Sequence, residues 1–544
     1  MTYSSIDTCK DIFNRLISDP SFLPLPKEAL DLANKVRFSF GESEEGKLFL
    51  PCPFKQAETI SALKGVEGTV ANAVGKARFG TTQNVDIDMY HATFFLLMAY
   101  VASVDGYTKL DKEEVKKRLK DTDLFQAQSD PYRRMSANLY KTKDNKYYHI
   151  HGSLEASTTL KMIGLEPFTG ITDYHKIIEI IGGAVAKFTA DELEDLNAKN
   201  RQAGTIALTQ EDFLNTPHGK LISSLPYIDC QKLPEDNFSP PAPFPEKGDQ
   251  ILSGFKVVEL CRIIAGPTIG RVLAEYGAEV IKVTSPNLPD VPFFQVDGNM
   301  GKKTTDLDLT TEKDRTTFEE LIADADIILD GYRTGALEKL GFGPKSFAGR
   351  GKKRGKGYIY VSENCFGFQG EWAHRPGWQQ IADCVSGLAW TQGKAMGRDE
   401  PIIPPFPMSD YGTGCMGAIA AMSAVLQRSQ TGGSYWATTS LVQYDLLLMA
   451  QGQYPENVWK TIKDNCDPSF RDNRYYDSVD QISSSALKSI KSHHLDALQQ
   501  NYLLEAYSPG FGECKVLKPV VKMEKTPNRF NQVTRPNGYD EPKW

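Results

Sequence analysis

Apolar and polar positions alternate in blocks in the middle of the chain, and the blocks predict a strand, a loop, a helix and a second strand. Residues 257–260 form a short apolar run that is typical of a buried parallel strand. Residues 268–276 carry apolar side chains at helical spacing, and Gly277 follows them as a helix-ending glycine. Residues 280–283 supply the second strand. In this βαβ order the loop at 261–267 lies at the carboxyl end of the first strand, where open parallel sheets bind ligands.

The same patterns predict elements on both sides of this unit. Turn residues between two β-rich arms at 140–150 predict a hairpin. The apolar run at 90–104 predicts one helix. Because the run is shorter than the roughly 20 residues that cross a bilayer, we expect this helix to be buried in the core of the protein. The remaining predicted elements are strands at 85–87, 327–329 and 358–361 and helices at 59–78, 174–181 and 190–203.

Two distant stretches follow the same order of features. Residues 66–98 and 416–449 each read as a small-residue helix ending in arginine, a polar turn, a strand and an apolar helix. With the two arginines aligned, Ile60 falls opposite Asp410, and Glu58 lies two residues earlier. We therefore predict that the first stretch is a partial copy that lacks the second stretch's carboxylate.

Composition shifts divide the chain into five predicted units. A proline-rich spacer separates the two halves, because it has few apolar residues that could build a core. The units are a degenerate partial copy of large-domain elements at 1–125, a small α/β domain at 126–236, the spacer at 237–250, a catalytic α/β domain at 251–462, and a C-terminal segment at 463–544 that returns to the large domain.

The overall composition favours small-molecule partners. The 62 basic and 69 acidic residues give a mildly acidic balance, which offers no support for nucleic-acid binding. Nine cysteines without any C-x-x-C pair favour a reducing compartment over a disulfide framework. The start of the chain lacks the basic and apolar segments of a secretory signal. We therefore expect a cytoplasmic protein that has no membrane partner.

Two classes of cofactor are disfavoured. An NAD site is not expected, because no G-x-G-x-x-G fingerprint follows the first strand, and Thr284 and Ser285 stand where an acidic residue would hold a ribose. A metal site is not expected at His149 and His151, because they alternate on a predicted strand with no third ligand nearby.

Asp410 is the residue with the clearest candidate chemistry. It precedes a glycine-interrupted turn and a helix with a stripe of small residues. A carboxylate at such a helix start is stabilised by the helix dipole, which keeps it deprotonated and available as a nucleophile. Aspartate is also a preferred N-cap, so local pattern alone leaves both interpretations open and favours the cap.

Basic residues gather in loops near the predicted strand ends. They either hold the phosphates of a nucleotide-like ligand or form solvated loops, and both interpretations stay open. The residues concerned are Lys302, Lys303, Arg333, Lys339 and the run at 350–356.

Five motifs in the second half carry a resemblance to a known family. They are LSGFKVVELCRIIAGPTIGRVLAEYGAEVIKV at 252–283, GKKTTDLDL at 301–309, IILDGYRTGALEKLGFG at 327–343, FGFQGEWAHRPGWQQIADCVSGLA at 366–389, and DYGTGCMGAIAAMSAVLQRSQTGGS at 410–434. Together they resemble the class III CoA-transferases, the CaiB/BaiF family, in family order over more than 180 residues. Residues 59–235 resemble a further, degenerate stretch of the same family, placed ahead of the second half instead of after it.

The resemblance implies an α/β fold with a Rossmann-like parallel-sheet large domain and a smaller α/β domain. It implies transfer of CoA between an acyl-CoA and a free carboxylic acid through an aspartyl anhydride and thioester, with no metal and no NAD, and Asp410 as the nucleophile. The residues that it assigns to CoA contacts are Ile263, Ile264, Ala265, Lys302, Lys303, Gly331, Tyr332 and Lys339. Members of the family are interlocked homodimers, so the fused copy predicts either a homodimer or a pseudo-dimeric monomer.

Two other functions remain as alternatives. Racemases of 2-methylacyl-CoA share the fold and need a second base, which in them is a histidine at the position of Trp378, although His374 lies close by. A non-catalytic CoA-binding protein is the other alternative, because one copy lacks its acid. Asp410 is the feature that argues against it.

Overall fold

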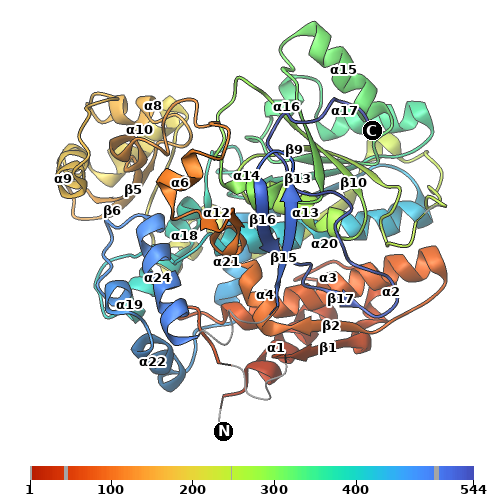
Figure 1. Ribbon diagram of the computed structural model, residues 1–544, viewed down its shortest axis with the longest axis horizontal. Coiled ribbons are helices and arrows are strands. Elements are labelled where there is room, and N and C mark those ends of the chain that lie inside the picture. The colour runs from red at the N-terminus through yellow and green to blue at the C-terminus, as the bar shows by residue number, and fades with distance from the viewer. Residues whose placement is uncertain (1–2, 42–46, 247, 495–500) are drawn as a thin grey trace.

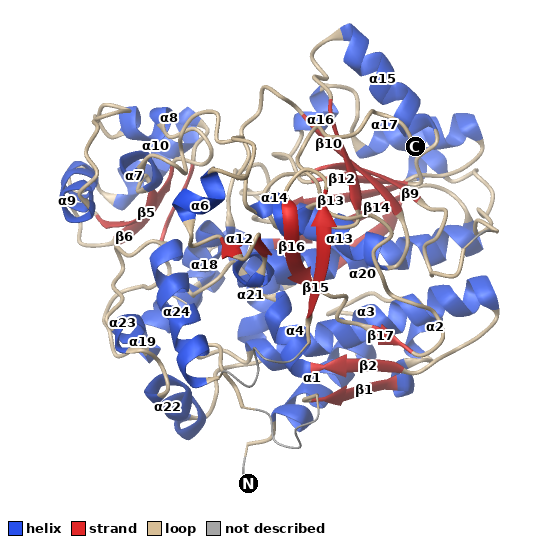
Figure 2. Ribbon diagram, viewed as in Figure 1, coloured by secondary structure: helices blue, strands red, loops and turns tan. Residues whose placement is uncertain are grey.

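The computed structural model describes residues 3–41, 47–246, 248–494 and 501–544, and its centre is a seven-stranded sheet (Figures 1 and 2). The sheet has the order β11-β10-β9-β12-β13-β14-β8, in which β8 alone runs antiparallel to its neighbour. Its strands are β9 Lys256–Leu260, β10 Glu279–Thr284, β11 Lys302–Asp306, β12 Ile327–Asp330, β13 Ile359–Asn364, β14 Tyr435–Ser440 and β8 Ile228–Lys232.

The six parallel strands are doubly wound. Three are laid down outward from β9 and the next three outward from β12 on the other side, so the strand order reverses between β9 and β12. Loops that leave the carboxyl ends of strands at such a switch point diverge and open a crevice. The Rossmann-like fold expected from the sequence is confirmed, and the switch point places the ligand site after β9 and β12.

Helices cover both faces of the sheet, which explains the continuous apolar runs in its central strands. Val257 packs into the core shared with α13 and α20, whereas Val258 packs into the core shared with α15 and α17. A parallel strand covered on both faces reads as a continuous apolar run rather than an alternating one. The four covering helices are α13 Ala265–Glu275, α20 Met408–Thr431, α15 Glu312–Ala323 and α17 Pro344–Arg354.

A smaller sheet, formed by two strands of the first half and one strand near the end of the chain, repeats the arrangement around β14. In the order β1-β2-β17 the middle strand is parallel to the first and antiparallel to the third, as β14 is to β13 and β8. A long helix precedes each middle strand and a second helix follows it. These elements are β1 Val36–Ser39, α3 Gln56–Phe79, β2 Val85–Asp88, α4 Met89–Phe95, α21 Leu441–Ala450 and β17 Lys522–Met523.

The two long helices, α3 and α20, have 24 residues each and pack against each other. When they are aligned at their first residues, the pairing of equivalent positions differs from the expected one. Glu58 is the third residue of α3, and Asp410 is the third residue of α20. Counted from the start of each helix, Glu58 and not Ile60 is therefore the residue equivalent to Asp410. The alignment on arginines was two residues off. Glu58 is buried, and its two oxygens accept hydrogen bonds from Tyr3 Oη at 2.9 Å and Tyr454 Oη at 2.7 Å. That α3 belongs to a partial copy stays a prediction.

The prediction of a single helix at 90–104 is wrong. The chain there forms α4, then α5 Met98–Val101, then the strand β3 Ser103–Val104. The Ala99 amide donates to the Tyr411 hydroxyl of α20 at 2.9 Å rather than to a helical carbonyl. Asp105 and Gly106 both have positive φ and form the two-residue turn between β3 and β4 Tyr107–Thr108, which pair as a hairpin. The sequence interpretation missed this Asp-Gly turn signal because it follows an apolar run.

The predicted hairpin is confirmed as part of a small α/β unit. Its antiparallel sheet has the order β5-β6-β7, with β5 Ala137–Lys141, β6 Tyr147–His151 and β7 Ala203–Ile206. Helices α8 Ser157–Met162, α9 Tyr174–Val185 and α10 Ala190–Asn200 share its apolar core. Strand β8, expected in this unit, lies in the large sheet instead.

The last residues of the chain contact the large sheet, whereas β15 Leu503–Ser508, β16 Gly512–Leu517 and β17 join two smaller sheets. The Thr304 amide on β11 donates to Asp540 Oδ2 at 2.7 Å. No helix in the described ranges is long and apolar enough to cross a membrane. The remaining elements are α1 Ser5–Ser18, α2 Lys27–Leu30, α6 Lys112–Lys116, α7 Pro131–Arg134, α11 Gln210–Asn215, α12 Pro217–Ser223, α14 Phe294–Gly298, α16 Ala336–Lys339, α18 Gln379–Ser386, α19 Leu388–Ala395, α22 Glu456–Asp464, α23 Pro468–Arg471 and α24 Val479–His493.

Candidate active site

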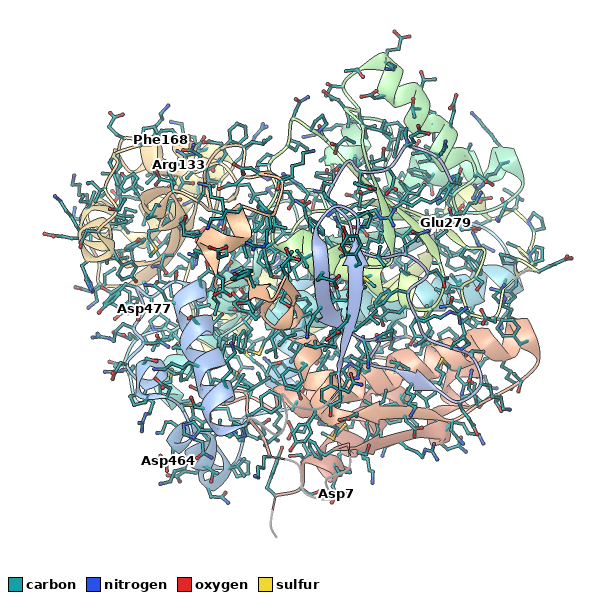
Figure 3. All side chains as sticks on the ribbon, viewed as in Figure 1. Asp7, Arg133, Phe168, Glu279, Asp464 and Asp477 are labelled. Atoms are coloured by element: carbon teal, nitrogen blue, oxygen red, sulfur yellow. The ribbon has the colours of Figure 1, made fainter. Side chains whose placement is uncertain are left out.

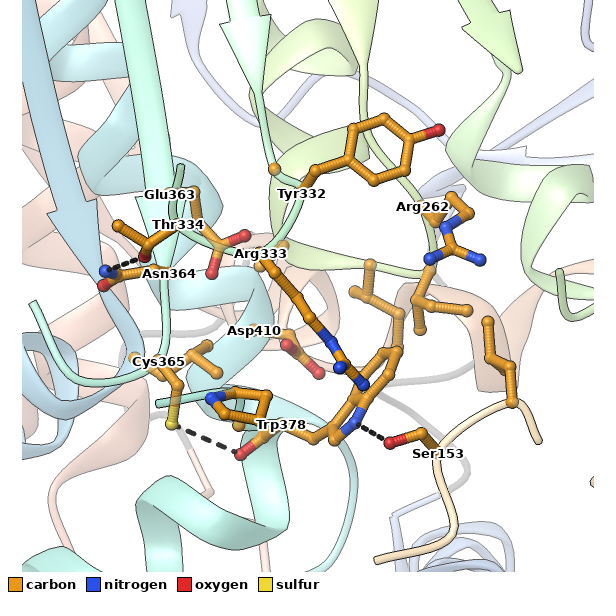
Figure 4. Close-up of a pocket in the computed structure, with 18 of the residues that line it drawn as sticks. Ser153, Arg262, Tyr332, Arg333, Thr334, Glu363, Asn364, Cys365, Trp378 and Asp410 are labelled. Carbon is orange, nitrogen blue, oxygen red and sulfur yellow. Dashed lines mark hydrogen bonds between the residues drawn. The ribbon is translucent and has the colours of Figure 1, made fainter. Parts of the chain in front are cut away.

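A cavity of about 370 Å³ opens at the switch point between β9 and β12 (Figure 4). Its walls come from the loops that follow β9, β12 and β13, from the start of α20, and from the small α/β unit. The lining residues include Ser153, Glu155, Arg262, Ile263, Ile264, Ala265, Gly331, Tyr332, Arg333, Thr334, Glu363, Asn364, Trp378 and Asp410. Segments far apart in the sequence therefore complete one site.

Asp410 lines this cavity from the first turn of α20. It is not the N-cap, because that position is held by Pro407, and no side-chain cap bond starts the helix. Within the described ranges no hydrogen bond holds the Asp410 carboxylate, which is half-buried and faces the cavity (Figure 4). The capping interpretation therefore has no support, and the side chain is left available for chemistry.

The environment of Asp410 disfavours its charge. Burial, and to a smaller extent the nearby Asp445 carboxylate, raise the pKa of Asp410 to about 8. The sequence interpretation expected the helix dipole to keep Asp410 deprotonated, whereas burial favours the protonated form in the free protein. Ser409 Oγ lies 2.6 Å from Asp445 Oδ1 and 2.9 Å from Asp383 Oδ1, and this bridge fixes the start of α20.

The loop after β9 approaches Asp410 closely and is strained. Ile263 has φ of +72°, a conformation that β-branched residues avoid and that costs roughly 1–3 kcal/mol. A Cβ at Gly266 would lie 2.7 Å from Cys261 Sγ, and a Cβ at Gly331 would lie 3.0 Å from the same atom. Glycine at both positions lets the loops after β9 and β12 meet over that thiol. Such strain is typical of a binding site.

The structure brings together five of the eight residues assigned to CoA contacts. Ile263, Ile264, Ala265, Gly331 and Tyr332 all line the cavity with Asp410. The other three residues, Lys302, Lys303 and Lys339, lie outside it.

The two neighbouring lysines are held by other partners. Lys302 is fully buried, 2.7 Å from Glu259 Oε2, and donates to the Pro267 carbonyl at 2.7 Å. A CoA contact by Lys302 would require that buried ion pair to break, so its assignment is corrected to a structural one. Lys303 pairs with Glu279 at 2.8 Å, whereas Lys339 is exposed on α16 and its contact stays a prediction.

The sequence interpretation missed several lining groups. Arg262 follows β9 directly, donates to the Pro289 carbonyl at 2.8 Å and lies over the Tyr332 ring, so with Arg333 it supplies cations to the cavity. Glu363 lies near the carboxyl end of β13, and burial together with Asp410 and Asp330 raises the pKa of its carboxyl to about 8. The strand ends were the available signal, because each of these residues lies at or just after the end of a strand of the parallel sheet.

Trp378 connects the catalytic domain to the small unit. Its indole nitrogen donates to Ser153 Oγ at 2.9 Å, and its ring stacks on His151 with ring centroids 5.4 Å apart. This position therefore holds no base. His374 is exposed and lines neither cavity that contains Asp410, so it is not placed to be the second base of a racemase.

Across the described ranges no group of three His, Cys, Asp or Glu side chains is arranged to hold a metal ion. His149 and His151 are buried on β6 with ring centroids 5.6 Å apart, where burial lowers the pKa of both.

Comparison with known proteins identifies relatives over most of the chain. The model of CoA-transferase family III matches residues 252–500. The acetyl-coenzyme A transferase nodX of Hypoxylon pulicicidum is 33% identical, over 98% of this chain and 92% of its own length. An acyl-CoA transferase of Gibberella moniliformis (strain M3125 / FGSC 7600) is 32% identical, over 88% of this chain and 86% of its own. A solved CaiB/BaiF family protein from Brucella suis aligns with a TM-score of 0.38 and 19% identity over 54% of this chain and 97% of its own.

Proposed function

The chain belongs to CoA-transferase family III, and from this membership and the geometry of the cavity we propose that it moves CoA from an acyl-CoA to a free carboxylic acid through a covalent intermediate on Asp410. The observation that carries the proposal is the position of the Asp410 carboxylate, which shares one cavity with the strained loop at Ile263. A nucleophile has to face the thioester carbonyl, and this loop lies at the ligand-binding edge of the sheet.

The chemistry is a series of acyl exchanges. An Asp410 oxygen attacks the thioester carbonyl, the carbon–sulfur bond breaks, and CoA thiolate leaves a mixed anhydride on the aspartate. The thiolate then attacks the Asp410 carbonyl carbon, releases the donor acid as a carboxylate, and forms an aspartyl-CoA thioester. The acceptor carboxylate reverses these two steps and regenerates Asp410. Over the whole cycle one thioester and one carboxylate are exchanged for another thioester and another carboxylate, so no ATP is consumed.

The residues around Asp410 support these steps. Arg262 and Arg333 place two guanidinium groups on the cavity wall, where they suit the phosphates of CoA. Ser153 of the small unit and Trp378 of the catalytic domain are hydrogen-bonded on the cavity wall, where they restrict the access of water to the anhydride. Because both walls come from one chain, we propose that the chain acts as a pseudo-dimeric monomer.

Trapping the covalent intermediate tests this function. Incubation with a panel of acyl-CoAs followed by hydroxylamine converts an aspartyl-CoA thioester into an aspartyl hydroxamate with release of CoA. Mass spectrometry of peptides is expected to find the hydroxamate at Asp410, and only in samples that received an acyl-CoA. Modification of Glu363 instead, or of no residue with any acyl-CoA, would contradict the nucleophile assignment.

The raised pKa of Asp410 predicts an alkaline activity profile. Only the ionised carboxylate attacks, so kcat/KM is expected to rise with pH and to level off above an apparent pKa of about 8. Initial rates between about pH 6 and about pH 9.5 measure the profile. Asp445→Asn removes a charge that raises the pKa of Asp410, so the rise should move to lower pH in that variant. A profile that stays flat across this range would count against a carboxylate nucleophile with this pKa.

A further inference from the structure

A second, smaller cavity lies on the other side of Asp410. Its volume is about 70 Å³, and Ile263, Trp378 and Asp410 line both cavities. The far wall of the second cavity is polar and comes from the first half of the chain and from α24. It includes Tyr100, Lys109, Gln128, Arg134, His151 and Asp480. Asp410 therefore lines both the larger cavity and a polar chamber.

Arg134 in this chamber has few partners for a guanidinium. Its Nη2 lies 3.4 Å from Asp480 Oδ2, which is the one side-chain hydrogen bond it makes within the described ranges, and its buried Nε has none. The adjacent Arg133 makes four, to Glu155, Ser157 and two carbonyl oxygens, and lies over the Phe168 ring (Figure 3). Arginine carries five N–H donors, and a buried donor without a partner is costly. Arg134 is thus arranged to receive an acceptor that the protein does not supply.

The charges of the chamber do not balance. Lys109 is ion-paired with Asp480 and lies 3.4 Å from the Tyr100 hydroxyl, so one carboxylate serves two cations. His151 adds no charge, because burial lowers its pKa well below the ordinary value. Asp410 is the other carboxyl group on the chamber wall, and burial raises its pKa, so its neutral form is favoured in the free protein. One positive charge then remains at Arg134, whose side chain is about 14% exposed. An anion is the ligand that balances this charge.

We propose that this chamber binds the second carboxylate of a short dicarboxylic acid, whose first carboxyl group reacts at Asp410. The inference rests on the proposed function and specifies its substrate class. The CoA moiety occupies the larger cavity, the reacting carbonyl faces Asp410, and the distal carboxylate meets Arg134 and Lys109.

The size of the chamber limits the acid. About 70 Å³ holds roughly five water-sized groups. The part of a four-carbon dicarboxylic acid beyond its reacting carboxyl group has five non-hydrogen atoms. A fatty acyl chain would be too long and would place methylene groups against two cations.

The test compares succinate with butyrate, which has the same number of carbons and lacks the second charge. CoA exchange with each acid is measured in the wild type and in Arg134→Gln, Arg134→Lys and, as a matched control outside both cavities, Lys116→Met. Binding of each acid is measured in the same proteins by calorimetry. We expect Arg134→Gln to lower kcat/KM for succinate at least about 10-fold more than for butyrate. Arg134→Lys should restore part of the difference, and Lys116→Met should behave like the wild type.

The outcomes separate this proposal from the function on which it rests. Equal use and equal binding of succinate and butyrate by the wild type would overturn the dicarboxylate chamber, whether or not the variants fold. Exchange of butyrate alone would also overturn it while the transferase function stands. If no acid is exchanged but succinate binds and Arg134→Gln abolishes the binding, the chamber stands and the function fails.

Discussion

Replacing Asp410 by Asn is expected to lower CoA exchange by at least about 10⁴-fold, because the amide has no anionic oxygen to attack the thioester. Binding of CoA should be retained, since the residues that line the larger cavity keep their positions. Exchange of labelled free acid into acyl-CoA measures the loss, and calorimetry with CoA measures binding. Retention of more than a small fraction of the exchange, in a preparation free of wild-type protein, would remove Asp410 from the mechanism.

The same substitution has a second expected effect, on stability. The folded protein raises the pKa of Asp410 from 3.8 to about 8, so it holds that proton more tightly than the unfolded chain does. A group of this kind stabilises the fold at low pH, and its contribution is lost as pH rises through the folded-state value. Asn does not titrate, so the free energy of unfolding of the variant should exceed that of the wild type increasingly between about pH 4 and about pH 8. Denaturant midpoints at several pH values measure this difference.

Gly414→Ala is expected to disrupt both folding and transfer. A Cβ at Gly414 would lie 2.5 Å from both Cβ and Cγ2 of Thr268 on α13 and 3.1 Å from the Ala265 carbonyl oxygen. To relieve the clash, α13 and its preceding loop have to move away from α20, which carries Asp410. Such overpacking costs roughly 1–3 kcal/mol. A shift of about 1 Å between the reacting groups lowers transfer by about 100-fold.

A matched glycine elsewhere tests this explanation. Gly349 lies within α17, where an added Cβ would meet nothing within 4 Å. Gly349→Ala should therefore raise stability by about 0.5–1 kcal/mol through helix propensity and leave exchange unaltered. Urea midpoints and exchange rates of the two variants are compared. If Gly414→Ala instead matched Gly349→Ala, the close approach of α13 and α20 would not matter for the site.

The parts of the site that follow from local pattern were predictable. The apolar runs gave β9, β10, β12 and β13, and glycine with proline marked the loop at Ile263, because strand and turn signals depend on neighbours in sequence. Lys302 was misassigned because its partner Glu259 lies on another strand. Arg134 and Ser153 could not be linked to Asp410, because packing of the small unit against α18 brings them to the cavities. The pKa of Asp410 was missed for the same reason, since burial is a property of the fold.

The buried Glu58 limits how much acyl group one polypeptide can carry. It stands at the same place in its helix as Asp410, yet Tyr3 and Tyr454 occupy its two oxygens, and neither cavity reaches it. Complete loading with a radioactive thioester should therefore stop at one equivalent per chain, although the chain holds two such helices. On the proposed mechanism, each chain would then carry one acyl group at a time, on Asp410. Helix α3, which carries Glu58, would contribute to the site by packing against α20.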